Sequence, residues 1–130
     1  MPISARTLQN NKAKGARYEK EVCELLAAEL NLPVERRRLE GQLDRGDVAG
    51  IPGLVIECKN EKKWSVWLWL RECKREVNAE IARSGKETRG VVMKRQTGFP
   101  DPRDSVVLMD MDTFLAYEKD RLGVGSHERR

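Results

Sequence analysis

The sequence predicts an α/β domain in which a central mixed β-sheet of about five strands is flanked by helices. Three observations support this class: a helical pattern over residues 12–30, a second over residues 64–83, and short apolar runs between and after them that indicate strands. Helix, strands, helix, strand, strand and helix, in that order, favour a mixed sheet covered by helices. The chain has 130 residues, so we expect a single domain over residues 1–130 with one core.

The N-terminal part of the chain predicts an arm, a helix and a strand. Residues 1–11 are polar and aperiodic, which favours a flexible basic arm. The first helix is expected over residues 12–30. It should stop before Asn31, because the residue that precedes Pro33 disfavours helix. Residues 34–39 follow as a strand.

The middle of the chain predicts the central strand of the sheet. After a polar loop over residues 40–45, residues 47–49 form a short strand and residues 50–53 a turn rich in glycine. Residues 54–59 are then the central strand. Successive side chains on a strand point to opposite faces, so the side chains of residues 54, 56 and 58 face one way and those of residues 55, 57 and 59 face the other.

The second helix, expected over residues 64–83, has two apolar faces. The stripe that should cover the sheet is Val66, Leu70, Cys73, Val77 and Ile81, with Trp69 on its edge. Trp64 and Leu68 fall on the opposite side, beside arginines, which is typical of an interface. A homodimer contact is the preferred interpretation. Packing by a neighbouring loop and stacking of a nucleic-acid base are the alternatives.

The C-terminal part of the chain predicts two further strands and a helix. Residues 89–95 contain an apolar run that indicates a strand, and residues 96–104 form a loop rich in glycine and proline. Residues 105–109 are the fifth strand. A short helix over residues 112–119 follows, capped by the aspartate at its start. Residues 123–130 are expected to be a disordered tail.

Composition excludes several classes of protein and site. Three cysteines at irregular spacing and one histidine, His127, argue against a disulfide framework, a structural zinc site and a histidine-activated nucleophile. No apolar run approaches the roughly 18–20 residues of a membrane span. The N-terminus also lacks the apolar block of a secretory signal. We therefore expect a cytoplasmic protein without membrane contact.

The net charge of +4 is unevenly distributed, which favours a polyanionic partner. Basic residues precede Glu19 without any acid among them, and two further blocks follow. Nucleic acid is the first candidate partner, and it would be held through its phosphates. The predicted phosphate contacts are Lys12, Lys14, Arg17, Arg36, Arg37, Arg38, Lys94 and Arg95.

An acidic cluster stands at the central strand. Glu57 and Lys59 are neighbours on one face of a strand that should be buried, where charged groups must be paired or bind a ligand. The turn before that strand brings Asp47 close. Two carboxylates and a lysine can hold a divalent cation and activate a water against a phosphodiester. Asp44, three residues before Asp47, could share or replace its role.

Glu19 is a third candidate carboxylate, because it lies in the middle of the apolar face of the first helix. This placement aims Glu19 at the sheet, where Asp47 and Glu57 are expected. The alternative is a glutamate at the edge of the core that pairs with an arginine. Gly15, one turn earlier, would let a strand or DNA approach the helix backbone closely.

The order of these motifs resembles a known family. Gly46-Asp47 followed by Glu57-Cys58-Lys59 is similar to the PD-(D/E)XK nuclease superfamily. The segment Lys14-Gly15-Ala16-Arg17-Tyr18-Glu19 resembles the first-helix motif of its archaeal-type Holliday junction resolvase branch, which includes phage-encoded relatives. The resemblance covers roughly residues 12–60. It departs from the name pattern at Gly46, which stands where the family has proline.

The resemblance implies a restriction-endonuclease-like core, dependence on Mg²⁺ with Mn²⁺ as a substitute, and a homodimer. Asp47, Glu57 and the backbone carbonyl of Cys58 would be metal ligands, and Glu19 would contact the metal directly or through water. Lys59 would orient the attacking water or neutralise the scissile phosphate. Asp47, Glu57, Glu19 and Lys59 are thus the expected catalytic residues.

The expected function is a structure-selective DNA endonuclease that cuts branched double-stranded DNA, foremost four-way junctions. A repair or restriction-type nuclease that acts on linear or flapped DNA is the first alternative, since the family serves many substrates. A non-catalytic DNA-binding module with the same fold is the second.

Overall fold

The computed structural model describes residues 5–37 and 46–125, with side chains from Lys12 onward. These residues contain three α-helices, five strands and one short 3-10 helix. In chain order the elements are α1 (Ala5–Leu30), β1 (Glu35–Arg36), β2 (Val48–Ala49), β3 (Leu54–Lys59), α2 (Val66–Ser84), β4 (Arg89–Lys94), η1 (Pro102–Asp104), β5 (Val106–Leu108) and α3 (Met111–Leu122).

The α/β class is confirmed, but the strands are divided between two sheets. β3 pairs in parallel with β4, and β4 pairs antiparallel with β5, so the central sheet is mixed and has three strands. β1 and β2 form a separate antiparallel ribbon of two residues each. The prediction of one five-stranded sheet is therefore wrong. The ribbon is too short to form a ladder with β3, and it meets β3 through one backbone hydrogen bond, from Asp47 N–H to the Ile56 carbonyl (2.8 Å).

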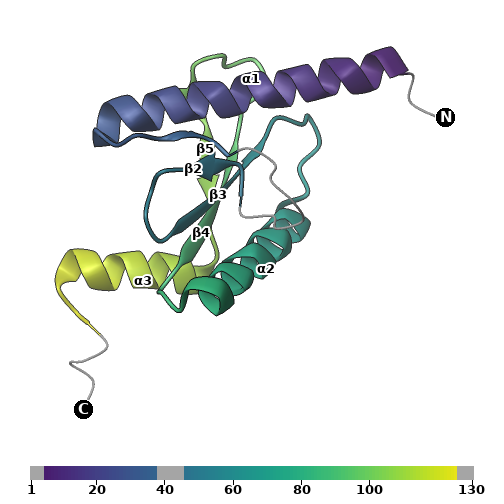
Figure 1. Cartoon of the computed structure of the whole chain (residues 1–130). Helices are drawn as coiled ribbons and strands as arrows, with labels where there is room; N and C mark the ends of the chain where they lie inside the picture. The colour runs from purple at the N-terminus through teal and green to yellow at the C-terminus, as the bar shows by residue number, and fades with distance from the viewer. Residues whose placement is uncertain (1–4, 38–45, 126–130) are drawn as a thin grey trace.

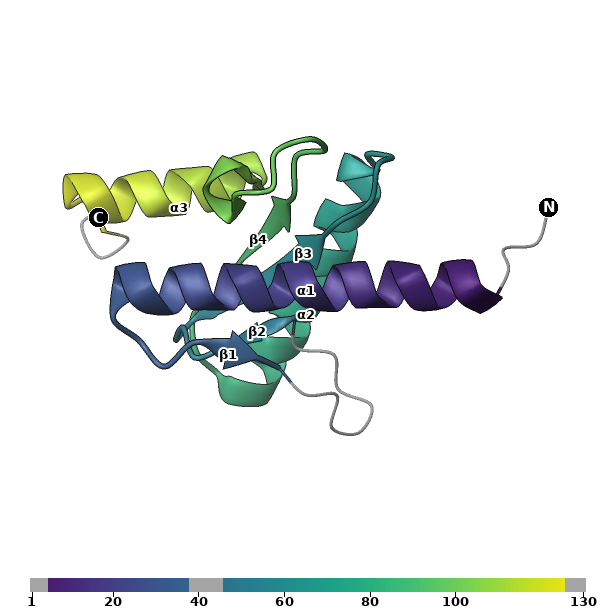
Figure 2. The same ribbon diagram turned by 90° about the horizontal axis from the view of Figure 1, so that it is seen from above.

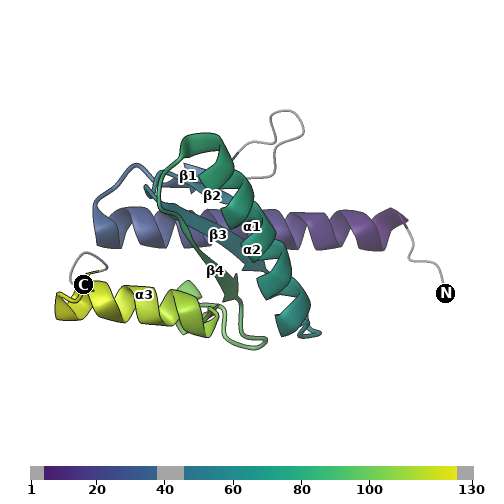
Figure 3. The ribbon, with the colours of Figure 1, turned by 90° about the horizontal axis from the view of Figure 1, so that it is seen from below.

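The helices cover opposite faces of the sheet. α1 lies across one face and α2 across the other (Figures 1 and 3). The core under α1 consists of Cys23, Val34, Val48, Ile56 and Val91. The core under α2 consists of Val55, Trp69, Cys73, Val77 and Val92. The predicted alternation along β3 is confirmed, because Ile56 packs on the α1 side and Val55 on the α2 side.

α1 is longer than predicted. It begins at Ala5, so residues 5–11 are helical and the prediction of an irregular arm is wrong for them. Residues 5–14 contain no glycine or proline that would end a helix, and the helix propensity of these residues extends α1 toward the N-terminus. These first turns project beyond the sheet (Figure 2). The predicted end is confirmed at Leu30, and Asn31 follows with a φ of 53°. Residues 1–4 of the predicted arm lie outside the described residues.

The predicted stripe of α2 is confirmed at Cys73 and Val77, which are buried, and Leu70 packs against them half-buried. Trp69, predicted at the edge of the stripe, is fully buried beside them, whereas Ile81 is exposed. The helix begins at Val66, so Trp64 precedes it. The large indole fills the space between helix and sheet. Gly90 permits this close packing, since a Cβ there would lie 2.6 Å from both the Cys73 Sγ and a Val77 methyl carbon.

The cap of α3 lies two residues earlier in the chain than predicted. The capping residue is Asp110, whose carboxylate accepts a 2.8 Å hydrogen bond from the Thr113 N–H, and not Asp112. The helix extends to Leu122. It is held against the sheet by Arg89, which forms a 2.6 Å ion pair with Asp120. Residues 126–130 of the predicted tail lie outside the described residues.

Two compositional expectations can be compared with the structure. The three cysteines, Cys23, Cys58 and Cys73, are all free thiols, as predicted. None of the helices within residues 5–37 and 46–125 combines the length and the apolar character that a membrane crossing requires.

Candidate active site

Asp47 lies against the open edge of β3, and its backbone holds it there. Its N–H donates to the Ile56 carbonyl (2.8 Å), and its carbonyl accepts from the Arg37 N–H (2.9 Å). Its carboxylate accepts a 2.7 Å hydrogen bond from the N–H of Cys58. The N–H and the C=O of one strand residue point to the same edge, so the Cys58 carbonyl also lies on the side of Asp47. The Asp47 carboxylate and the Cys58 carbonyl therefore lie at the same edge of β3.

Gly46 makes this approach possible. Its φ of 89° lies in the left-handed region, and a Cβ on it would come within 3.0 Å of the Ile56 carbonyl oxygen. Proline, whose φ is locked near −65°, cannot adopt this conformation. The glycine at position 46 thus has a physical reason in this chain.

Glu57 is buried on the α2 side of β3 with only 8% of its surface exposed. Burial, followed by hydrogen bonds to Glu76 and Asp47, raises the pKa of Glu57 to about 11. This shift favours the protonated form of Glu57, whose single O–H can donate to either Asp47 or Glu76.

Glu76 is the member of this cluster that sequence reasoning missed. It lies on α2, directly before the buried Val77, and its side chain reaches Glu57. The available signal was its position directly before Val77, a member of the stripe predicted to cover the sheet. The predicted stripe did not include Glu76, so the carboxylate was not recognised.

Lys59 is the second charged residue on this face of β3. Its Nζ lies 3.8 Å from a Glu72 carboxylate oxygen on α2. Residues 57 and 59 on the strand, and residues 72 and 76 on the helix, are both spaced by about 6–7 Å. The two pairs thus match in register, and α2 places one carboxylate opposite each of the predicted catalytic residues of β3.

Glu19 approaches the cluster from the other face of the sheet. Burial and the nearby Asp47 charge raise the pKa of Glu19, while Arg36 lowers it. The Arg36 Nε lies 3.3 Å from a Glu19 carboxylate oxygen, so the predicted alternative of an arginine pair is also realised. Asp47 therefore stands between Glu19 on the α1 side and Glu57 on the α2 side.

Some of the predicted phosphate contacts are exposed to solvent, and others already contact groups within the chain. Lys12, Lys14 and Arg17 are exposed on α1. Arg36 is exposed but pairs with Glu19, and Arg37 is half-buried with its guanidinium directed at the Val48 carbonyl. Arg38 and the alternative acid Asp44 lie outside the described residues.

Lys94 does not lie on the surface, contrary to the prediction. It is 1% exposed, its Nζ donates to the Arg95 carbonyl, and it lies 5.0 Å from the centre of the Trp64 ring. Burial lowers the pKa of Lys94. Its long stem fills space under the loop that carries Trp64. Lys94 therefore has a packing role, and Arg95 beside it is half-buried.

The predicted dimer residues differ in their surroundings. Trp64 covers Lys94 and lies 6.3 Å from the Trp69 ring, which agrees with the alternative of packing within the chain. Leu68 has 53% of its surface exposed and remains available to a partner.

The donor set of the cluster has the chemistry that Mg²⁺ requires. Asp47, Glu57 and the Cys58 carbonyl offer only oxygen ligands, which Mg²⁺ prefers. In the described part of the chain, however, no three His, Cys, Asp or Glu side chains stand in an arrangement that could hold an ion. A cation that binds the Glu57 carboxyl would have to displace its proton.

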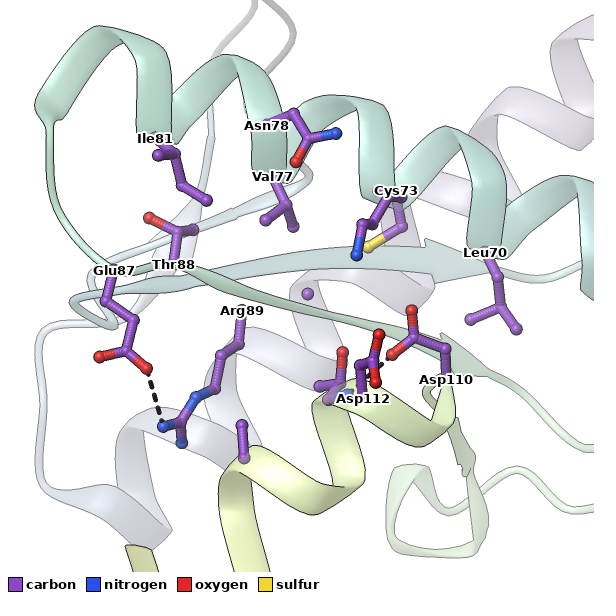
Figure 4. A pocket seen from close by; sticks show the side chains of 14 residues that line it. Leu70, Cys73, Val77, Asn78, Ile81, Glu87, Thr88, Arg89, Asp110 and Asp112 are labelled. Carbon is purple, nitrogen blue, oxygen red and sulfur yellow. Dashed lines mark hydrogen bonds and ion pairs between the residues drawn. The ribbon is translucent and has the colours of Figure 1, made fainter. Parts of the chain in front are cut away.

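A separate groove of about 190 Å³ lies between α2 and α3 (Figure 4). Its floor is formed by Cys73, Val77 and Gly90. On its rim, Arg89 is paired with Glu87 at 3.2 Å. The groove does not include any residue of the acidic cluster.

Comparison of the chain with family models, with curated proteins and with solved structures found no match. The resemblance described above therefore depends on the residues themselves.

Proposed function

We propose that the chain is a Mg²⁺-dependent, structure-selective DNA endonuclease that cuts branched DNA, foremost four-way junctions. The observation that supports this best is the position of Asp47. Its carboxylate contacts the Cys58 backbone and shares a hydrogen bond with Glu57, and Lys59 follows on the same face of β3. Asp, Glu and Lys at one strand edge are a suitable set for phosphodiester hydrolysis.

In this proposal Asp47, Glu57 and the Cys58 carbonyl hold the cation, and Glu19 contacts it directly or through water. When bound, Mg²⁺ or Mn²⁺ would lower the pKa of a coordinated water and offset charge on the phosphate. Glu57 must release its proton before it can act as a ligand. Three carboxylates, those of Asp47, Glu57 and Glu76, would then lie together, and the cation would offset their mutual repulsion.

Lys59 is the residue that would face the scissile phosphate. Its ammonium is a compact positive charge suited to a developing negative charge. The carboxylate of Glu72, 3.8 Å from the Lys59 Nζ, restricts where this charge can lie. Glu72 therefore acts as a positioning residue for Lys59.

The substrate would be held through phosphates by the exposed cations of α1, which are Lys12, Lys14 and Arg17. Such contacts position DNA without reading its sequence, and affinity should fall steeply with salt. A homodimer would place two active sites so that two strands of a junction are cut symmetrically. Linear or flapped DNA remains the alternative substrate.

A second candidate is a non-catalytic nucleic-acid-binding module. It is favoured by the exposed cations of α1, Lys12, Lys14 and Arg17, which can hold phosphates without a metal. In this case the buried carboxyl groups would have no role beyond the contact between β3 and α2.

Cleavage of a labelled four-way junction and a matched linear duplex, with and without Mg²⁺, distinguishes these candidates. We would compare the wild type with Glu57→Ala and Lys59→Ala, and use Glu118→Ala on α3 as a control for loss of an unrelated acid. Paired cuts in the junction alone, absent in the first two variants and retained in the control, would support the proposal. Cutting of the duplex would favour the alternative substrate. Folded wild-type protein that cuts neither substrate would favour the binding module.

A further inference from the structure

The outward face of α2 carries a basic surface that the proposed active site does not use. Trp67, Arg71, Lys74 and Arg75 are all exposed, and they lie within about 100° of one another around the helix axis. We refer to these four residues as the α2 basic face. Trp67, Arg71 and Arg75 lie on the side of α2 opposite Cys73, and Lys74 lies at the edge of this face, where it also lines the groove between α2 and α3.

Charge on α2 is segregated between its two sides. The helix has three acids, Glu72, Glu76 and Glu80, and each is half-buried toward the sheet or its flank. The α2 basic face contains no acid. In the described part of the chain, Arg71 and Arg75 form no hydrogen bond or ion pair, so their charges face solvent without internal compensation. A surface of this kind is complementary to a polyanion.

Trp67 gives this surface a second property. It has 73% of its surface exposed, whereas Trp69 is in the core and Trp64 covers Lys94. An indole buries a large apolar area when it is covered, and leaving it in water forgoes that stabilisation. Two exposed lysines, Lys62 and Lys63, precede it in the loop after β3. A flat aromatic ring among cations is the arrangement that stacks the bases of single-stranded nucleic acids.

The α2 basic face begins close to the acidic cluster. Glu72 contacts Lys59 at 3.8 Å. Trp67 lies five residues earlier on the same helix, about 7.5 Å along its axis. The loop that carries Lys62 and Lys63 is also tied to α1, because the Asn60 side chain donates a 3.2 Å hydrogen bond to the Lys14 carbonyl. The loop that follows Lys59 therefore connects the acidic cluster to the first turn of α2, which carries Trp67 on its outward side.

We propose that the α2 basic face binds an unpaired segment of nucleic acid, with one base stacked on Trp67 and phosphates held by Arg71 and Arg75. The proposal deepens the nuclease assignment and rests on it for the identity of the strand as DNA. At a branch point, such a contact would hold the unstacked strand and explain a preference for branched over linear duplex substrates. An acidic peptide would satisfy the arginines but would not require a planar apolar surface among them.

Binding measured in EDTA tests this without any cleavage. A fluorescently labelled oligothymidylate and a duplex of equal length would be titrated with wild type, Trp67→Ala, Trp67→Phe and the double variant Arg71→Ala/Arg75→Ala, followed by fluorescence anisotropy. Arg121→Ala, an exposed arginine on α3, is the control for charge. Thermal melts would establish that each variant is folded.

We expect Trp67→Ala to weaken oligothymidylate binding about 5- to 100-fold, with partial recovery in Trp67→Phe. The double arginine variant should reduce the slope of log affinity against log salt by about 1.4. Unchanged single-strand affinity in folded Trp67→Ala and double arginine variants would overturn the proposal. So would a change in oligomeric state with unchanged affinity, since it would make the surface a contact between copies of the chain. A failed cleavage assay with intact, Trp67-dependent binding would refute the nuclease assignment alone.

Discussion

The carboxylate of Asp47 accepts a 2.7 Å hydrogen bond from the backbone N–H of Cys58 across the open edge of β3. This contact joins the β1–β2 ribbon to the central sheet and sets Asp47 beside the carboxyl of Glu57. Glu19 is directed at the same carboxylate from α1. One aspartate therefore connects acidic groups from both faces of the sheet.

Glu57→Gln is expected to stabilise the protein at neutral and alkaline pH. The folded-state pKa of Glu57, about 11, lies above its unfolded value. Its contribution to stability is therefore complete below about pH 4 and declines as the pH rises toward the folded pKa. Glutamine keeps a hydrogen-bond donor and never ionises. We expect the free energy of unfolding to rise by about 1–2 kcal/mol near pH 8 and to be unchanged near pH 4, as measured by urea unfolding. An equal effect at both pH values would contradict the assigned protonation.

Mg²⁺ or Mn²⁺ is expected to raise the melting temperature of the wild type. A ligand that binds only the folded state at 100 times its Kd adds about 2.7 kcal/mol to the free energy of unfolding. Asp47→Asn should lose this shift, and Glu118→Gln on α3 should retain it. The measurement is a thermal melt with and without metal. A shift of equal size in Asp47→Asn would place the metal elsewhere.

Lys94→Ala is expected to destabilise the fold rather than weaken DNA binding selectively. The side chain is buried under Trp64, so truncation leaves a cavity and removes the contact with the ring. We expect a loss of about 2–3 kcal/mol in the free energy of unfolding. Lys86→Ala, at an exposed lysine, should change it by less than about 0.5 kcal/mol. A stable Lys94→Ala protein with a reduced salt slope for DNA binding would restore the original surface assignment.

Two glycine substitutions should have opposite effects. In Gly90→Ala the new Cβ would lie 2.6 Å from the Cys73 Sγ and a Val77 methyl, so α2 must shift, at a cost of about 1–3 kcal/mol. At Gly15 none of the residues that the structure describes lies within 4 Å of such a Cβ, so none of the described strands approaches that helix face. Gly15→Ala should therefore stabilise α1 by about 0.5–1 kcal/mol. Chemical denaturation of both variants tests the pair, and a Gly15→Ala protein with weaker DNA binding would indicate close DNA approach there.

Leu68→Glu is expected to convert a dimer to a monomer in sedimentation, because Leu68 is exposed and its neighbours on the chain do not cover it. Trp64→Ala should instead lower stability, since Trp64 packs on Lys94. If Leu68→Glu leaves the sedimentation of a dimeric wild type unchanged, the dimer contact lies elsewhere.

Features that depend on neighbours in the sequence were predictable. The end of α1 at Leu30, the extent of β3 and the opposite orientation of Ile56 and Glu57 follow from chain stiffness, proline sterics and the two-residue period of a strand. The nearness of Asp47 to Glu57 also follows, because a turn of a few residues must bring them together.

Other features depend on contacts between distant segments, and here local pattern was insufficient. The full burial of Trp69 over β3 and β4, and with it the approach of Glu76 to Glu57, was decided by how α2 packs on the sheet. Lys94 is buried because the loop that carries Trp64 returns over it. The sequence by itself determined the order of elements and the acidic character of the β3 edge. Only the tertiary structure decided which charges are buried, since burial is the result of packing between elements that are separate in the chain.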